Sequence, residues 1–198
     1  TTPGLRLQLD NTGYLATDGI DFQLNYSHDF DAVRWAVAVV GNWTNKSEFK
    51  ALPTSDIRDC VGLYSVDCGS IQPSWQWQVR NTLAFGDIDV SLLWRYISRV
   101  EYEYGDAFKG KINAPSSVLN GEEADFNFIP AYHMFDLTAR AAVGENLTLT
   151  FGIQNLFDKQ PKVIGMDLGP TAYNSGNVYP STYDTLGRRY SVTARFRF

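Results

Sequence analysis

Residues 188–198 read RRYSVTARFRF, and this stretch decides the fold. Successive side chains of a β-strand point to opposite faces, so the stretch would have one apolar face and one polar face. The apolar face carries Tyr190, Val192, Ala194, Phe196 and Phe198, and the polar face carries Arg189, Ser191, Thr193, Arg195 and Arg197. Such a strand is typical of a wall with lipid on one side and a wet lumen on the other. The stretch therefore predicts a membrane strand and favours the outer membrane of a bacterium.

The same alternation recurs along the rest of the chain. Six earlier segments show it: Ile20–Tyr26, Val33–Thr44, Trp75–Phe85, Ile88–Tyr102, His133–Val143 and Leu147–Gln154. Apart from whatever charge His133 carries, their apolar faces have no formal charge. A Lys or Arg at mid-bilayer on such a face would cost roughly 2–4 kcal/mol. A further strand is expected at Leu5–Leu9, before a tight turn at Asp10–Gly13. The sequence thus predicts an all-β fold of about eight antiparallel strands.

The connections between these segments alternate strictly between short and long. Short turns are expected at His28–Ala32, Phe85–Asp87 and Val143–Asn146, and long loops at Asn45–Ser74, Glu103–Pro130 and Leu156–Gly187. Bacterial outer-membrane barrels have short periplasmic turns and longer extracellular loops. Aromatic residues also gather near the predicted strand ends, as the two interfacial girdles of such barrels require: Trp43, Trp75, Phe85 and Phe198. Both patterns favour an antiparallel transmembrane β-barrel segment.

Composition excludes several other classes. The chain of 198 residues has a net charge of −5, which argues against a nucleic-acid partner because such a protein needs a concentrated basic face. No apolar run approaches the roughly 20 residues of a membrane helix. The chain begins TTPG without Met or signal peptide, so it is expected to be a mature product or a piece of a longer protein. The spacing of Cys60 and Cys68 suits a small loop disulfide in an oxidising compartment, and the alternative is two unpaired thiols.

Two stretches near the C-terminus resemble a known family. Leu147–Lys159 reads LTLTFGIQNLFDK, and Tyr183–Phe198 reads YDTLGRRYSVTARFRF. Together they resemble the C-terminal end of TonB-dependent outer-membrane receptors, in which an NLFDK-like motif ends the penultimate strand and a GR motif opens the last one. Thr17–Tyr26, TDGIDFQLNY, is similar to an earlier strand of that family. The resemblance extends over the chain, but its specific motifs lie in the last third.

The resemblance implies a fold and a function. Family members have a 22-stranded barrel with an N-terminal plug, so residues 1–198 are expected to be the C-terminal part of the barrel, without the plug. The implied partners are the remainder of the barrel, the plug, the TonB complex acting through the plug, and outer-membrane lipid. The implied activity is energised import of a scarce nutrient, such as a ferric siderophore, an oligosaccharide or a cobalamin-like compound. No enzymatic activity and no cofactor are expected.

Two groups of residues are candidates for function. A predicted lumen charge network comprises Arg34, Arg80, Arg95, Arg99, Arg140 and Arg195, with Arg189, Arg197, Asp21, Asp89, Glu101 and Asp136 interspersed. We interpret it mainly as cross-strand ion pairs that hydrate the lumen and dock a plug, and alternatively as a guide for anionic substrates. Aromatic residues of the loops are candidates for stacking on a ligand or, equally, for packing the loops together: Tyr64, Trp75, Tyr173, Tyr179 and Tyr183.

Weaker signals point to other activities. Acidic clusters at Glu101–Asp106 and Glu122–Asp125 have oxygen ligands for Ca²⁺ but lack EF-hand spacing, so solvated loops are the preferred interpretation. His28 and His133 lie on separate strands and are expected at the membrane interface rather than on a metal. No Gly-x-Ser-x-Gly elbow is present. Two alternative architectures stay open: a self-contained eight-stranded barrel with a structural or adhesion role, and a soluble β-sandwich.

Overall fold

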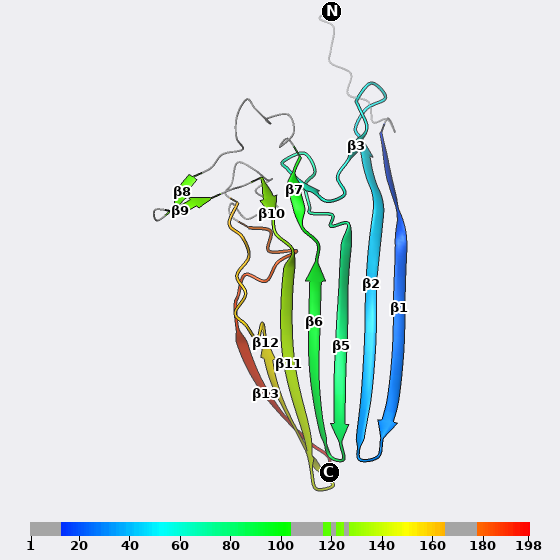
Figure 1. Cartoon of the computed structure of the whole chain (residues 1–198), viewed down its shortest axis with the longest axis vertical. Coiled ribbons are helices and arrows are strands. Elements are labelled where there is room, and N and C mark those ends of the chain that lie inside the picture. Colours follow the sequence, from blue (N-terminus) through cyan, green and yellow to red (C-terminus); the bar gives the residue numbers. More distant parts are fainter. Residues whose placement is uncertain (1–12, 104–116, 120–121, 125–126, 165–177) are drawn as a thin grey trace, which may run out of the picture.

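The computed structural model describes residues 13–103, 117–119, 122–124, 127–164 and 178–198. Its main element is one long antiparallel sheet in which neighbouring strands are also consecutive long strands of the chain (Figure 1). The strands, in sheet order, are β1 (Tyr14–Phe30), β2 (Val33–Lys50), β5 (Trp75–Phe85), β6 (Ile88–Ile97), β11 (Tyr132–Val143), β12 (Leu147–Gln154) and β13 (Arg189–Phe196). A short strand, β3 (Arg58–Asp59), pairs with the loop end of β2. The predicted all-β antiparallel class is confirmed.

The sheet is open rather than closed on itself. β1 and β13 form its two edges, and no ladder joins them. The strand expected at Leu5–Leu9, with nearly all of the turn that follows it, lies outside the described residues. In the part of the chain that the structure describes, no helix is long and apolar enough to cross a membrane.

Between the short turns and the loop ends, the pairing register places apolar side chains opposite apolar side chains, except at Asn81. Trp94 of β6, for example, lies between Val79 of β5 and Phe135 of β11. Residues directly opposite one another in an antiparallel pair share a face, so the predicted apolar sides of all seven long strands form a single apolar face. Much of that face is uncovered: Leu24 is 59% exposed and Val192 is 75% exposed. The other face, the polar face, carries arginines, carboxylates and most of the carboxamides of the sheet, whereas Asn81 lies on the apolar face.

The three short turns lie where the alternation predicts them. They connect β1 to β2, β5 to β6, and β11 to β12, and Figure 1 shows all three at the end of the sheet where the C-terminus lies. Gly86 and Gly144 occupy these tight turns with positive φ angles of 58° and 63°. Glycine adopts this left-handed backbone without the steric cost of a Cβ atom.

Three predicted strands have wrong bounds. β1 extends over Tyr14–Phe30 instead of Ile20–Tyr26, because both of its ends also pair with β2. β2 continues past Asn45 to Lys50, because its polar end still pairs with β1, which begins at Tyr14 and has a bulge between Asp18 and Gly19. The segment expected at Ile88–Tyr102 is divided into β6 and a separate β7 (Val100–Tyr102). β7 joins a small sheet with β10 (Phe128–Ile129) and, in parallel, with β4 (Leu63–Tyr64). Val100 is thereby fully buried instead of extending the apolar face.

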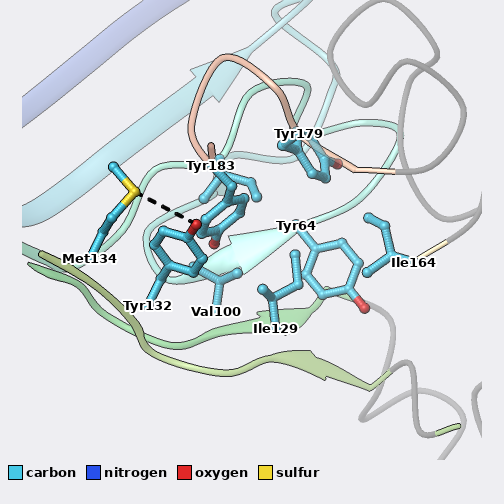
Figure 2. Packing of buried hydrophobic residues seen from close by; sticks show 9 residues of the cluster. Tyr64, Val100, Ile129, Tyr132, Met134, Ile164, Tyr179 and Tyr183 are labelled. Atoms are coloured by element: carbon cyan, nitrogen blue, oxygen red, sulfur yellow. Dashed lines mark hydrogen bonds between the residues drawn. The ribbon is translucent and has the colours of Figure 1, made fainter. Parts of the chain in front are cut away.

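The hydrophobic core lies among the long loops rather than on the sheet. Its buried members, here called the loop core, are Tyr64, Ile71, Val100, Ile129, Tyr132, Met134, Ile164, Tyr179 and Tyr183. Figure 2 shows Tyr132 and Met134 at the edge of this cluster, joined by a hydrogen bond of 3.9 Å from the Tyr132 hydroxyl to Sδ of Met134. The loop core thus anchors the long loops to the β11 end of the sheet. A separate hairpin, β8 (Ser117–Leu119) and β9 (Glu122–Ala124), completes the described strands.

Candidate functional site

A cavity of about 980 Å³ lies on the polar face near the loop end of the sheet. Side chains of β1, β2, β5, β6 and β11 line one side of it, and the segment Pro180–Asp184 lines the other, with Arg189 at the start of β13. We call it the polar-face cavity. Its volume is at the upper end of the range of about 300–1,000 Å³ found for small-molecule sites.

The segment beside the cavity is held down by packing and by charge. The ring of Tyr183 packs edge-on against that of Tyr132, with centroids 5.2 Å apart. Oδ1 of Asp184 accepts hydrogen bonds from Arg189 (2.8 Å) and from the backbone amide of Leu186 (3.0 Å). Burial alone would raise the pKa of the Asp184 carboxyl, but these hydrogen bonds and the Arg189 charge outweigh it and hold the pKa below its usual value. Asp184 is therefore a charged anchor for this side of the cavity.

The two C-terminal sequence motifs meet at the base of the loop that carries this segment. Asn155 is fully buried, and its side chain accepts from the backbone amide of Lys159 (2.7 Å) and donates to the carbonyl of Lys159 (3.0 Å). Oδ1 of Asp158 accepts from the backbone amide of Arg188 at 2.9 Å. Gly187 has a φ of 73°, and a Cβ added there would lie 2.8 Å from Oδ1 of Asp158. The NLFDK and GR motifs therefore form one structural unit that fixes both ends of the loop.

Arg95 connects this unit to the cavity wall. It forms an ion pair of 2.5 Å with Oδ2 of Asp136, and Oδ1 of Asp136 accepts from the backbone amide of Asn155 at 2.8 Å. The side chain of Asp136 is only 14% exposed, so both of its oxygens are used within the protein. The position of Arg95 is thus determined by the same turn that closes β12.

Most of the predicted lumen arginines lie on the polar face and have local partners. Arg34 pairs with Asp29 (3.6 Å), Arg140 with Asp89 (2.7 Å), and Arg80 donates to Ser91 (3.2 Å). This arrangement favours the ion-pair interpretation over an unpaired basic strip. Arg195 also lies on this face, opposite Thr148.

Arg99 was expected on the same face but lies among the loops. The break after β6 places its guanidinium 4.1 Å from the ring centroid of Phe128 and 3.1 Å from the carboxylate of Glu101.

The candidate loop aromatics are mostly unavailable as a ligand platform. Tyr64 and Tyr179 are completely buried and Tyr183 is 3% exposed, because all three belong to the loop core. Burial raises the pKa of Tyr179 to about 12 and also raises that of Tyr183. Trp75 lies on the apolar face, 6.0 Å from Trp43 between ring centroids. Of the four candidates within the described residues, only Tyr183 also lines the polar-face cavity. The structure thus favours packing of the loops. Tyr173 lies outside the described residues.

The predicted disulfide is present and belongs to a polar cluster at the loops. Cys60 and Cys68 are joined with an Sγ–Sγ distance of 2.15 Å. The carboxylate of Glu103 accepts from the Ser65 hydroxyl (2.5 Å) and pairs with Arg58. Ser65 in turn accepts from the backbone amide of Cys68 at 2.9 Å. The disulfide loop is therefore tied to the residue that follows β7.

The sequence interpretation did not single out the carboxamide side chains of the cavity. These are Gln23, Asn42, Gln76 and Gln78, here called the carboxamide cluster, and all four line the polar-face cavity. Each had been assigned to a polar face, but only the pairing register brings them together from three strands.

Both histidines lie against aromatic rings. His133 lies on the apolar face, where its Nδ1 accepts from Nε1 of Trp94 at 3.2 Å. His28 packs on Phe30 near the first short turn, with ring centroids 4.4 Å apart. In the described part of the chain, no three His, Cys, Asp or Glu side chains come together as metal ligands would. The Ca²⁺ alternative at Glu122–Asp125 is not addressed, because these side chains are outside the described set.

Comparisons with known proteins name no relative. No protein-family model matches the chain, and no curated protein matches its sequence.

Proposed function

We propose that the chain supplies wall strands and surface loops to the barrel of a TonB-dependent outer-membrane receptor that imports a scarce nutrient. The observation that carries this proposal is the single apolar face across seven antiparallel strands, much of which is exposed in the described chain. Exposed apolar surface of this extent requires apolar surroundings. A lipid bilayer provides them on one side while the polar face stays in water.

The height of the apolar face supports a membrane position. On β6 the face extends from Ile88 near the short turn to Tyr96 near the loops. At about 3.3 Å per residue this span measures about 26 Å along the strand. At the strand tilt of about 35–45° in outer-membrane barrels, the span covers about 19–22 Å of height, most of an apolar band that is about 25 Å tall. Aromatic rings gather at the upper limit of the span, where Trp77 stacks on Tyr96 with centroids 3.8 Å apart.

The free edges of the sheet support further strands beyond β1 and β13. An unpaired edge leaves a row of backbone N–H and C=O groups without partners, which is not tolerated in lipid. In our proposal, additional strands of the receptor pair with both edges, and a plug fills the lumen and engages the TonB complex. The two C-terminal motifs that carry the family resemblance contact each other at Asp158 and Gly187, which supports reading them as one functional unit of the chain.

The cargo under this proposal is a ferric siderophore, an oligosaccharide or a similar bulky nutrient, and the chain itself performs no bond chemistry. The main competing function is a self-contained eight-stranded barrel with a structural or adhesion role. It would require β1 and β13, directly or through one further strand, to close the sheet.

The deciding experiment is membrane fractionation followed by intact mass measurement of the natural polypeptide that carries this C-terminus. We expect the polypeptide in the outer-membrane fraction after an alkaline wash, with a mass that corresponds to a chain of several hundred residues. An outer-membrane product near 22.3 kDa would support the small barrel instead. Recovery as a detergent-free soluble monomer would contradict both membrane functions.

A further inference from the structure

The carboxamide cluster forms an uncharged polar patch around Val40, with the carboxylate of Asp21 in register beside Asn42. Asn42 of β2 lies directly opposite Gln76 of β5, and Gln23 of β1 and Gln78 of β5 lie on either side of Val40. A carboxamide offers two N–H donors and one carbonyl acceptor and does not titrate. Among the described residues, only Asn42 in this cluster has a side-chain hydrogen bond, to Thr44 at 3.3 Å. The other three leave their donors and acceptors directed to the cavity or to water.

The charged residues around this surface cancel. Among the described residues, the charged ones that line the cavity are Asp21, Arg95, Asp184 and Arg189, so two negative and two positive charges give a net charge of zero. Both arginines are already paired, Arg95 with Asp136 at 2.5 Å and Arg189 with Asp184 at 2.8 Å. An anionic ligand would therefore find no excess positive charge here, and it would have to displace a carboxylate to gain an arginine.

We propose that the polar-face cavity is a binding subsite for an uncharged, hydroxyl-rich ligand, the chemistry of a neutral oligosaccharide. Each sugar hydroxyl both donates and accepts hydrogen bonds. Carboxamides also do both, so they match such a ligand better than a surface of charges of one sign would. This inference rests on the proposed transport function and narrows its cargo: it selects the carbohydrate class over anionic iron chelates. The cavity volume of about 980 Å³ is at the upper end of the range for small-molecule sites, so it can accept a ligand as large as an oligosaccharide segment.

The test is direct binding to the full-length receptor, purified in detergent from outer membranes. The probes are neutral hexamers of glucose, xylose and N-acetylglucosamine, with hexagalacturonate and ferric citrate as anionic counterparts. We expect at least one neutral hexamer to bind and the anionic probes to bind more weakly. The double variant Gln76→Met, Gln78→Met should weaken that binding roughly five- to tenfold for each carboxamide removed, as expected for one neutral hydrogen bond.

The matched control is Asn81→Leu, which removes a carboxamide from the same strand but on the apolar face, opposite Leu92. It should leave sugar binding unchanged. Three results would overturn the inference: no binding of any neutral hexamer, sugar binding undiminished by the double variant, or ferric citrate as the probe whose binding the double variant abolishes. In the last case the receptor could still be an outer-membrane importer with a different cargo. The binding assay therefore tests the cargo class, whereas fractionation and intact mass test the proposed transport function.

Discussion

Introducing one arginine on the apolar face tests whether that face of the sheet contacts lipid. Val39 lies on the apolar face of β2, between Leu24 of β1 and Val79 of β5. It is four residues from Trp43 at the loop end and six from Val33 at the turn end, or about 13 and 20 Å along the strand. Val39 is therefore near the middle of the apolar face. If that face contacts lipid, Val39→Arg places a guanidinium close to the bilayer midplane, where it costs roughly 2–4 kcal/mol.

The matched control is the adjacent residue. Val40 points to the polar face, lines the cavity and is 42% exposed. Val40→Arg should therefore change stability by about 0.5 kcal/mol or less, as other solvated substitutions do. The expected cost of Val39→Arg corresponds to an unfolding constant that rises roughly 30- to 700-fold, at about 1.4 kcal/mol per tenfold change.

The assay is guanidinium unfolding of the full-length receptor in lipid vesicles, followed by tryptophan fluorescence, with heat-modifiable gel migration as an independent measure of folding. We expect the unfolding midpoint of Val39→Arg to fall and that of Val40→Arg to stay near the parent value. If Val40→Arg is as damaging as Val39→Arg, or more so, the apolar face does not contact lipid and the argument from its chemistry fails.

Three further predictions concern the loops. Gly187→Ala should cost about 2–3 kcal/mol in chemical unfolding, because a φ of 73° is combined with a contact of 2.8 Å to Asp158. Gly86→Ala, with open space at its site, should cost about 1 kcal/mol from backbone strain alone. Burial raises the pKa of Tyr179 to about 12, so the folded protein favours the neutral phenol. The stability that results is complete below pH 10 and is lost as the pH rises through 12. Tyr179→Phe should therefore remove one late phenolate step from the absorbance titration at alkaline pH. Replacing both cysteines of the Cys60–Cys68 disulfide with serine should cost about 2–3 kcal/mol and make the loop susceptible to protease, as a reductant should in the parent protein.

Local sequence rules were sufficient for the strands that lie in the apolar band. The alternation predicts Trp75–Phe85 and Leu147–Gln154, which are the observed bounds of β5 and β12. These segments are short and bounded by turns, and one face is apolar except at Asn81 of β5, so the period of two determines both their type and their orientation.

The same rules fail where a strand leaves the apolar band. The end of β2, with its sequence NKSEFK, loses the alternation but keeps its pairing, as Ser47 still lies opposite Thr17. A strand surrounded by water on both faces needs only its backbone ladder, so hydrophobic periodicity no longer marks its end. The opposite error occurs after Ile97, where the periodicity continues but the strand does not. Parallel pairing of β7 with β4 captures Val100 in the loop core.

The loop tyrosines show why exposure could not be predicted from the sequence. A tyrosine in a long polar loop suits both a ligand platform and a packed interior, since the ring is apolar and the hydroxyl is polar. What decides for Tyr64 and Tyr179 is that segments far apart in the chain meet, with ring centroids 6.5 Å apart. Contacts of this kind leave no local signal.

The register of the sheet couples its two faces. Shifting one strand by a single residue would move every side chain to the other face, so Gln76 and Gln78 would face the apolar side and Trp77 would enter the cavity. The continuous apolar face therefore fixes the register, and the register in turn brings the carboxamide cluster together. The residues of the apolar face, which we assign to lipid contact, thus position the carboxamide cluster, which we assign to ligand binding. They do so without touching the ligand themselves. On this argument, substitutions in the cluster should alter binding with little effect on stability, whereas substitutions in the apolar face should alter stability first.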